Sequence, residues 1–223
     1  MTVKLFFSAL LKLVLGFVLM GLLIFLPAGS VCFLGGWLLL GVLFVPMVMM
    51  GVFLMVFAPE LLEKRLESKE KQKDQSTLIK LSGLMFVIGF AAAGLDFRFS
   101  ILPMPKWVML SACAVFLAGY ALYAVVLFQN RYLSRTVRVY EGQKVVDTGL
   151  YSIVRHPMYL ATILMFLSMP LVQGSVISLA IFLFYPVIIV FRIIGEEKLL
   201  EKELCGYAEY KKKIKYRLIP FVW

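Results

Sequence analysis

Long apolar stretches separated by short charged segments dominate the chain. Five stretches approach or exceed the length of a membrane span: Leu5–Leu26, Val31–Ala58, Leu81–Leu95, Trp107–Asn130 and Tyr159–Phe191. A helix needs about 20 mostly apolar residues to cross a hydrocarbon layer about 30 Å thick, because backbone groups cannot stay unpaired in lipid. The pattern therefore predicts a bundle of membrane helices.

The last apolar stretch, Tyr159–Phe191, is too long for one crossing. It has 33 residues without a charge, and Pro170 and Gly174 interrupt it near its middle. Both residue types break or end helices. We expect a C-terminal helical hairpin there, with a short first arm that is tilted or partly re-entrant. The whole chain then has five to six membrane-embedded helices.

The composition agrees with this pattern. Of 223 residues, 62% are apolar and 16% are charged, against about 45–50% and 25% in soluble proteins. A soluble monomer of this size cannot bury so much apolar surface. Three cysteines are too few for a disulfide framework. The sequence therefore predicts an all-α polytopic membrane protein, a single domain over residues 1–223 with free thiols and no metal site.

The positions of lysine and arginine predict the orientation of the bundle. Six cations lie in residues 64–80, five in 131–155 and eight in 192–217, whereas the opposite side of a six-helix topology keeps only Arg98 and Lys106. Loops on the cytoplasmic side carry the excess of these residues. Both termini and the polar segments are therefore expected to be cytoplasmic. This topology accounts for the net charge of +10, so nucleic acid is not a predicted partner.

Residues 1–30 have an alternative interpretation as a cleaved signal peptide, with Ala28-Gly29-Ser30 as the cleavage site. The length of the first apolar stretch and the presence of Lys12 within it argue against that interpretation. We therefore expect the first stretch to be retained as a membrane helix.

A first polar segment, Gly149–Tyr159, ends where the hairpin begins and contains Arg155-His156-Pro157. Proline suits the first helical position because its missing N–H costs nothing there. The free amides of such a helix start can receive a carboxylate or phosphate. The structural alternative is a loop that enters the membrane, with Arg155 held at lipid headgroups and His156 as a local cap.

A second polar segment, Arg192–Glu197, lies at the far end of the hairpin. Arg192 and Glu196 are four residues apart and share one helical face, whereas Glu197 is turned away by about 100°. Ionisable groups at this depth are costly unless they pair with one another or with a ligand. The structural alternative is an ion pair that closes the helix. Because the hairpin returns to the same side, both polar segments are expected to form one site.

Two further motifs follow near the C-terminus, Gly206-Tyr207-Ala208-Glu209-Tyr210 and Arg217-Leu218-Ile219-Pro220. Together with the two polar segments they resemble the C-terminal signature of the isoprenylcysteine carboxyl methyltransferase family and that of the related phospholipid N-methyltransferases. The resemblance covers residues 94–223, whereas residues 1–93 match only as membrane spans. It divides the chain into a methyltransferase-like core and accessory N-terminal spans.

The resemblance implies S-adenosylmethionine as the methyl donor and S-adenosylhomocysteine as the product, in a cytoplasmic pocket under the C-terminal segment. The acceptor would approach from the bilayer. Arg192 matches the arginine that engages the acceptor, and Glu197 is the second candidate catalytic residue, as a base for an amine acceptor. Carried over by position, the cofactor contacts are Gln143, Lys144, Val145, Val146, Tyr151, His156, Pro157, Met158, Tyr159 and Glu196.

The predicted function is methyl transfer to a lipophilic acceptor in the bilayer, with a carboxylate favoured over a phospholipid or other amine. Two other classes stay open: a nicotinamide-dependent membrane reductase and a non-catalytic membrane scaffold. A dinucleotide needs more phosphate-binding cations than Arg155 and Lys144 provide, and a scaffold would not bind S-adenosylmethionine. The sequence does not identify the acceptor or the oligomeric state.

Overall fold

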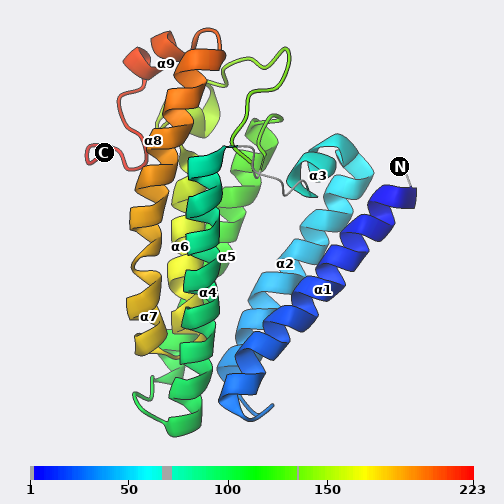
Figure 1. Ribbon diagram of the computed structural model, residues 1–223, viewed down its shortest axis with the longest axis vertical. Helices are drawn as coiled ribbons and strands as arrows, with labels where there is room; N and C mark the ends of the chain where they lie inside the picture. Colours follow the sequence, from blue (N-terminus) through cyan, green and yellow to red (C-terminus); the bar gives the residue numbers. More distant parts are fainter. Residues whose placement is uncertain (1–2, 67–71, 135) are drawn as a thin grey trace.

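The computed structural model describes residues 3–66, 72–134 and 136–223, and this part of the chain contains helices and no strands. The expected all-α class is therefore confirmed. Figure 1 shows the helices as one elongated bundle. The elements are α1 (Val3–Ala28), α2 (Leu34–Phe57), α3 (Pro59–Leu66), α4 (Lys73–Phe99), α5 (Lys106–Gln129), the short 3₁₀ turn η1 (Gly149–Ser152), α6 (Pro157–Gln173), α7 (Val176–Phe182), α8 (Tyr185–Glu203) and α9 (Tyr207–Lys213).

Six segments have the character of membrane helices. Helices α1, α2, α4 and α5 and the continuous stretch Val176–Glu203 are long and apolar enough to cross a bilayer, and α6 is a shorter apolar helix. With 17 residues, α6 is about 26 Å long at a rise of 1.5 Å per residue. The expected five to six membrane-embedded helices are confirmed, and the short first arm of the hairpin is α6.

The turn of the hairpin forms as its residue types require. Gly174 ends α6 with a φ of 78°, a left-handed conformation that glycine adopts without steric cost. Ser175 then caps α7, because its hydroxyl oxygen accepts a hydrogen bond from the Ser178 amide at 3.1 Å. The chain therefore reverses within two residues and sends α8 back beside α6.

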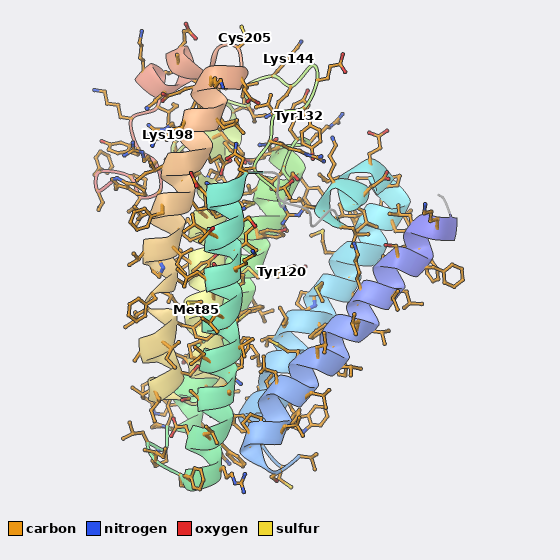
Figure 2. All side chains as sticks on the ribbon, viewed as in Figure 1. Met85, Tyr120, Tyr132, Lys144, Lys198 and Cys205 are labelled. Atoms are coloured by element: carbon orange, nitrogen blue, oxygen red, sulfur yellow. The ribbon has the colours of Figure 1, made fainter. Side chains whose placement is uncertain are left out.

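The loops gather at two ends of the bundle (Figure 1). We call one the cap end; it holds both ends of the described chain, α3, the connection 130–156 and α9. The other is the turn end, which holds the α1–α2, α4–α5 and α6–α7 connections. Lys144 and Lys198 lie at the cap end (Figure 2), whereas Arg98, near the end of α4, and Lys106, the first residue of α5, flank the α4–α5 connection at the turn end. The two ends thus differ in charge as the orientation argument requires.

A continuous apolar core joins the helices. Its fully buried members include Ile24, Leu39, Phe116, Phe182 and Ile189 from five different helices. The outer faces of the helices are also apolar, and Leu11, Phe57 and Trp107 are each more than 60% exposed. Apolar surface of this extent suits lipid rather than water. The fold is that of a multi-pass integral membrane protein.

Two glycines bring helices into close contact at the turn end. A Cβ placed on Gly35 of α2 would lie 2.4 Å from the carbonyl oxygen of Gln173, and one on Gly94 of α4 would lie 2.8 Å from that of Ile24. Distances this short leave no room for a side chain. The α1–α2 pair is therefore held against α4 and α6 by backbone contacts that only glycine permits.

Replacing Gly35 with alanine is expected to destabilise the protein by about 1–3 kcal/mol, because the added methyl group forces α2 away from α6. Gly41 on the same helix has open space around its Cβ position, so Gly41→Ala is the matched control and should be neutral or slightly stabilising. Thermal unfolding in one detergent compares the two variants. A Gly35→Ala protein that melts with the parent chain would contradict the tight contact.

Candidate active site

A cavity at the cap end brings together most of the residues expected to form a site. Its walls are the connection that follows α5, η1, the start of α6 and the second half of α8. Helix α9, which we call the α9 cap, closes it with Tyr207 and Tyr210. Figure 2 shows Tyr132 and Lys144 on the connection at this end. Ten of the expected residues line it: Gln143, Lys144, Val145, Val146, Tyr151, His156, Met158, Tyr159, Arg192 and Glu196.

The start of α6 forms one wall of the cavity. Pro157 is its first residue and His156 is the cap residue, whose side chain makes no capping hydrogen bond. Pro157 has no N–H, and the Tyr159 amide donates to the His156 carbonyl at 3.1 Å, so in the first turn the Met158 amide is the one available to a ligand. The Pro157 side chain is fully buried and is not among the described residues that line the cavity. Its position favours a role in setting the helix start, and the expected contact of Pro157 with the cofactor stays a prediction.

The C-terminal segment is fastened to this wall through its backbone. The amide of Arg155 donates to the Tyr216 carbonyl at 3.0 Å, and the amide of His156 donates to the Arg217 carbonyl at 2.8 Å. The Arg155 guanidinium also donates to the carbonyl oxygens of Ile214 and Lys215, at 2.5 and 2.9 Å. The polar segment before α6 therefore positions the tail that follows α9.

Glu197 holds the centre of this attachment. Its carboxylate accepts from Arg155 Nε at 2.7 Å and from Arg217 Nε at 3.0 Å, and His156 Nε2 lies 3.3 Å away. The residue is 3% exposed. A buried carboxylate with several partners of opposite charge is stable only while those partners stay in place. We call Glu197, Arg155, His156 and Arg217 the Glu197 clamp.

The contacts of Glu197 favour a positioning role over the expected catalytic role, which stays a prediction. Glu197 is absent from the described residues that line the cavity, and both of its carboxylate oxygens are engaged by the clamp. To act as a base it would have to leave these partners, at a cost of several kcal/mol for an uncompensated buried charge. Glu197 is therefore a positioning residue that joins α8 to the start of α6 and to the tail.

Arg192 and Glu196 face the cavity from α8. The Tyr159 hydroxyl donates to Glu196 Oε2 at 2.5 Å, which ties α6 to α8 across the cavity wall. Gln75 of α4 supports the same helix from behind, because its Nε2 donates to the Arg192 carbonyl at 3.3 Å. Glu196 is the one carboxylate among the described lining residues. The expected meeting of His156, Arg192 and Glu196 at one site is therefore observed.

Two tyrosines of the α9 cap also line the cavity. The Tyr210 hydroxyl donates to the Tyr151 carbonyl at 2.7 Å, and the Tyr151 hydroxyl accepts from Asn130 at 3.1 Å. Tyr207 is 4% exposed, and its hydroxyl has no hydrogen-bond partner in the described part of the chain. Burial and the nearby Glu197 and Glu196 raise the pKa of Tyr207. The hydroxyl therefore stays protonated and keeps a donor for a ligand.

Sequence reasoning did not identify part of the lining. The sequence did not point to the lining residues of the connection after α5, among them Tyr132 and Thr136. It also did not point to Leu200 and Leu204 at the end of α8 or to Tyr207 of α9. The density of tyrosines in the tail was the only signal for the cap. No short motif marks residues 130–138, since their place in the site depends on how the connection folds over the cavity.

Comparisons with known proteins agree with this arrangement. Residues 106–205 match the family described as phospholipid methyltransferase. A curated relative is the Delta(14)-sterol reductase of Mus musculus, 32% identical over 91 residues, or 40% of this chain; the chain spans only 22% of that reductase. A solved structure of a eukaryotic intramembrane Ras methyltransferase, isoprenylcysteine carboxyl methyltransferase, matches with a TM-score of 0.56 and 17% identity, over 92% of this chain and 74% of that one. The chain therefore has the fold of an intramembrane methyltransferase and carries, in residues 106–205, a phospholipid methyltransferase family match that confirms the resemblance expected from its sequence.

Proposed function

We propose that this protein is a membrane methyltransferase that uses S-adenosylmethionine and methylates a lipophilic carboxylate. The observation that carries the proposal is the convergence of His156, Arg192 and Glu196 on one cavity at the end of an apolar bundle. In this proposal residues 94–223 are the catalytic core, and residues 1–93 are accessory spans.

The described side chains fit the groups of S-adenosylmethionine. The Met158 amide at the start of α6 suits its carboxylate, because a helix start favours an anion. Glu196 suits its ammonium group or its ribose hydroxyls. The Tyr207 hydroxyl is buried near Glu196 and has no hydrogen-bond partner among the described residues. It can therefore bind another polar group of S-adenosylmethionine. An unpaired buried hydroxyl costs about 1–3 kcal/mol, which a ligand partner would recover.

The chemistry places modest demands on the protein. When bound, S-adenosylmethionine would supply a methyl group on a sulfonium: the acceptor would attack the methyl carbon in line with the carbon–sulfur bond, which breaks as S-adenosylhomocysteine leaves. The protein's own contribution is positioning, because correct alignment alone can supply about 7–11 kcal/mol of the barrier. Arg192 would orient a carboxylate by charge-assisted hydrogen bonds. The α9 cap and the connection 130–146 would exclude water from the reacting groups.

The charges of the lining favour an anionic acceptor. Lys144 and Arg192 line the cavity together with Arg138 and Arg155, against the single carboxylate of Glu196. Arg155 pairs with Glu197, which is not among the described lining residues, so the lining itself carries more cationic side chains than carboxylates. A carboxylate acceptor would balance this charge, whereas an ammonium acceptor would add to it. The acceptor's apolar part would stay in the bilayer. We place the cavity on the cytoplasmic side, from the distribution of lysine and arginine.

A nicotinamide-dependent reductase is the second candidate, since one relative is a sterol reductase. The two cofactors make different demands on the cavity. A dinucleotide brings a pyrophosphate in place of a sulfonium. Arg155 is already engaged by Glu197, Ile214 and Lys215, so the pyrophosphate would have to bind the other cationic lining residues, Arg138, Lys144 and Arg192. Direct binding measurements with both cofactors therefore separate the two functions.

We expect the purified protein to bind S-adenosylhomocysteine in calorimetry and to bind reduced nicotinamide dinucleotides much more weakly. Tyr207→Phe should weaken the binding of S-adenosylhomocysteine about threefold to tenfold, the value of one hydrogen bond. Tyr216→Phe is the matched control, because Tyr216 lies on the same tail but does not line the cavity. Tight binding of the dinucleotide alone would support the reductase, and binding of neither cofactor by folded protein would overturn both functions.

A further inference from the structure

A second cavity lies at the turn end, away from the proposed active site. It has a volume of about 220 Å³ and is bounded by the α4–α5 connection, the start of α2 and the end of α6. Its polar lining includes Asp96, Ser100, Lys106 and Gln173, and it shares no lining residue with the cap-end cavity. A water molecule takes about 30 Å³ of liquid, so this space exceeds the needs of a single water.

Asp96 is a buried carboxylate in this cavity. It is 3% exposed. One of its oxygens accepts from the Leu102 amide at 3.1 Å, and the other accepts from the Ser175 hydroxyl at 2.6 Å. Within the described residues no lysine, arginine or histidine forms an ion pair with it. A carboxylate has about four acceptor sites, and a buried charge without a counter-charge is costly at a membrane position.

Gln173 points independently to a ligand. It is 2% exposed, and neither polar atom of its side-chain amide has a hydrogen-bond partner in the described part of the chain. Buried amides are almost always paired. The close approach of Gly35 holds the backbone of this residue against α2. The hydrogen bond between Asp96 and Ser175 fastens α4 to the hairpin but leaves the Gln173 amide unexplained.

We propose that the turn-end cavity binds the primary ammonium group of an amphiphilic amine, with an aminophospholipid headgroup as its source. Asp96 supplies the counter-charge, and the side-chain oxygen of Gln173 supplies a further hydrogen-bond acceptor. A primary ammonium has the N–H donors that these acceptors need, whereas a quaternary ammonium has none. Lys106 lines the same cavity and suits a phosphate. Phe33, Leu34 and Met109 supply apolar lining for the adjoining part of the lipid. This site does not depend on the proposed methyl transfer.

The test measures thermal unfolding and native mass spectra of the full-length chain in detergent with added lipid. Phosphatidylethanolamine should raise the melting temperature by about 5 °C more than phosphatidylcholine with the same acyl chains, and should be retained in the mass spectrum. Asp96→Asn keeps the shape and removes the charge, so it should abolish this difference. Its Oδ1 can still accept from the Leu102 amide, whereas its Nδ2 would donate to the Ser175 hydroxyl. Equal responses of the parent protein to both lipids, or an unchanged difference in Asp96→Asn, would overturn the proposal.

Three further variants separate binding of the amine from packing of the helices. Ser175→Ala should lower the melting temperature in both lipids but keep their difference, because it removes the hydrogen bond to Asp96 and the cap of α7 and leaves the Asp96 charge in place. Gln173→Leu should reduce the difference and provides the decisive comparison if Asp96→Asn does not fold. Asp147→Asn, at an exposed carboxylate paired with Lys213, is the control. Free phosphoethanolamine that reproduces the whole shift would support the ammonium site but show that the acyl chains add nothing.

Discussion

Replacing Glu197 with alanine is expected to destabilise the protein by about 3–5 kcal/mol, the usual loss when one partner of a buried ion pair is removed. The substitution leaves Arg155 buried without its carboxylate and releases Arg217 of the tail. Because the Glu197 clamp joins α8, the start of α6 and the tail, the cap over the cavity should loosen. Thermal unfolding gives the loss, and limited proteolysis shows cleavage within residues 204–223.

Glu201 provides the matched control for this experiment. It lies one turn further along α8 and pairs with Lys211, and both side chains are more than a third exposed. Exposed pairs contribute about 0–1 kcal/mol, so Glu201→Ala should leave the melting temperature and the proteolysis pattern almost unchanged. If Glu197→Ala behaves like Glu201→Ala, the clamp does not hold the cap, and Glu197 becomes available again for a role in catalysis.

Arg192→Ala is expected to lower kcat/KM for methylation of a lipophilic carboxylate about 100-fold or more, because loss of a positioning charge at the reacting group has this magnitude. The affinity for S-adenosylhomocysteine should stay within about threefold, since the cofactor contacts proposed for α6, Glu196 and Tyr207 remain. Radiolabelled methyl transfer into a lipid extract measures the rate. Base treatment then releases the label from a methyl ester but not from an N-methyl product.

Lys198 is the control cation for Arg192. It lies on the same helix near the cap end (Figure 2) and does not line the cavity. Lys198→Ala should therefore keep full activity, whereas Arg192→Lys should restore only part of it because a lysine cannot form the two-pronged contact of a guanidinium. Base-stable label with unchanged activity in Arg192→Ala would indicate an amine acceptor and remove the carboxylate assignment.

The Glu197→Ala and Arg192→Ala variants test two different roles on α8, holding the fold together and positioning the acceptor. Glu196 faces the cavity and Glu197 faces the clamp, although they are adjacent in the sequence. A helix turns about 100° per residue, so one carboxylate can contact a ligand while the next one fixes the protein around it. A lower melting temperature in Glu197→Ala and a lower methylation rate in Arg192→Ala would show that different residues of α8 have these two roles.

Helices α1 and α2 contact the rest of the bundle near both of its ends. These two helices meet the others most closely at the turn end, where Gly35 and Gly94 allow backbone contact. At the cap end α3 bridges the gap, since Lys64 donates to the Arg131 carbonyl at 3.3 Å and Arg65 contacts Tyr123 of α5. Lys12, which lies within the first apolar stretch, donates to the Leu66 carbonyl at 2.6 Å. Its charge therefore meets the carbonyl end of α3 instead of lipid.

Local patterns were sufficient to determine the membrane class, the approximate helices and the start of α6. Apolar runs of 20 or more residues have few alternatives to membrane helices, and Pro157 and Gly174 fix a helix start and a helix end through their own backbone limits. The pairing of the two polar segments also followed from the sequence, because a hairpin must return to the side from which it came.

Only the tertiary structure decided which polar residue faces the cavity and which is used to hold the fold. Glu196 and Glu197 have the same side-chain chemistry, and their roles differ because Arg155 and Arg217 approach one carboxylate from segments 42 and 20 residues away. The unpaired Tyr207 hydroxyl and the Gln173 amide were equally hidden from the sequence. Whether a buried polar group has a partner depends on long-range packing, which no local pattern of residues specifies.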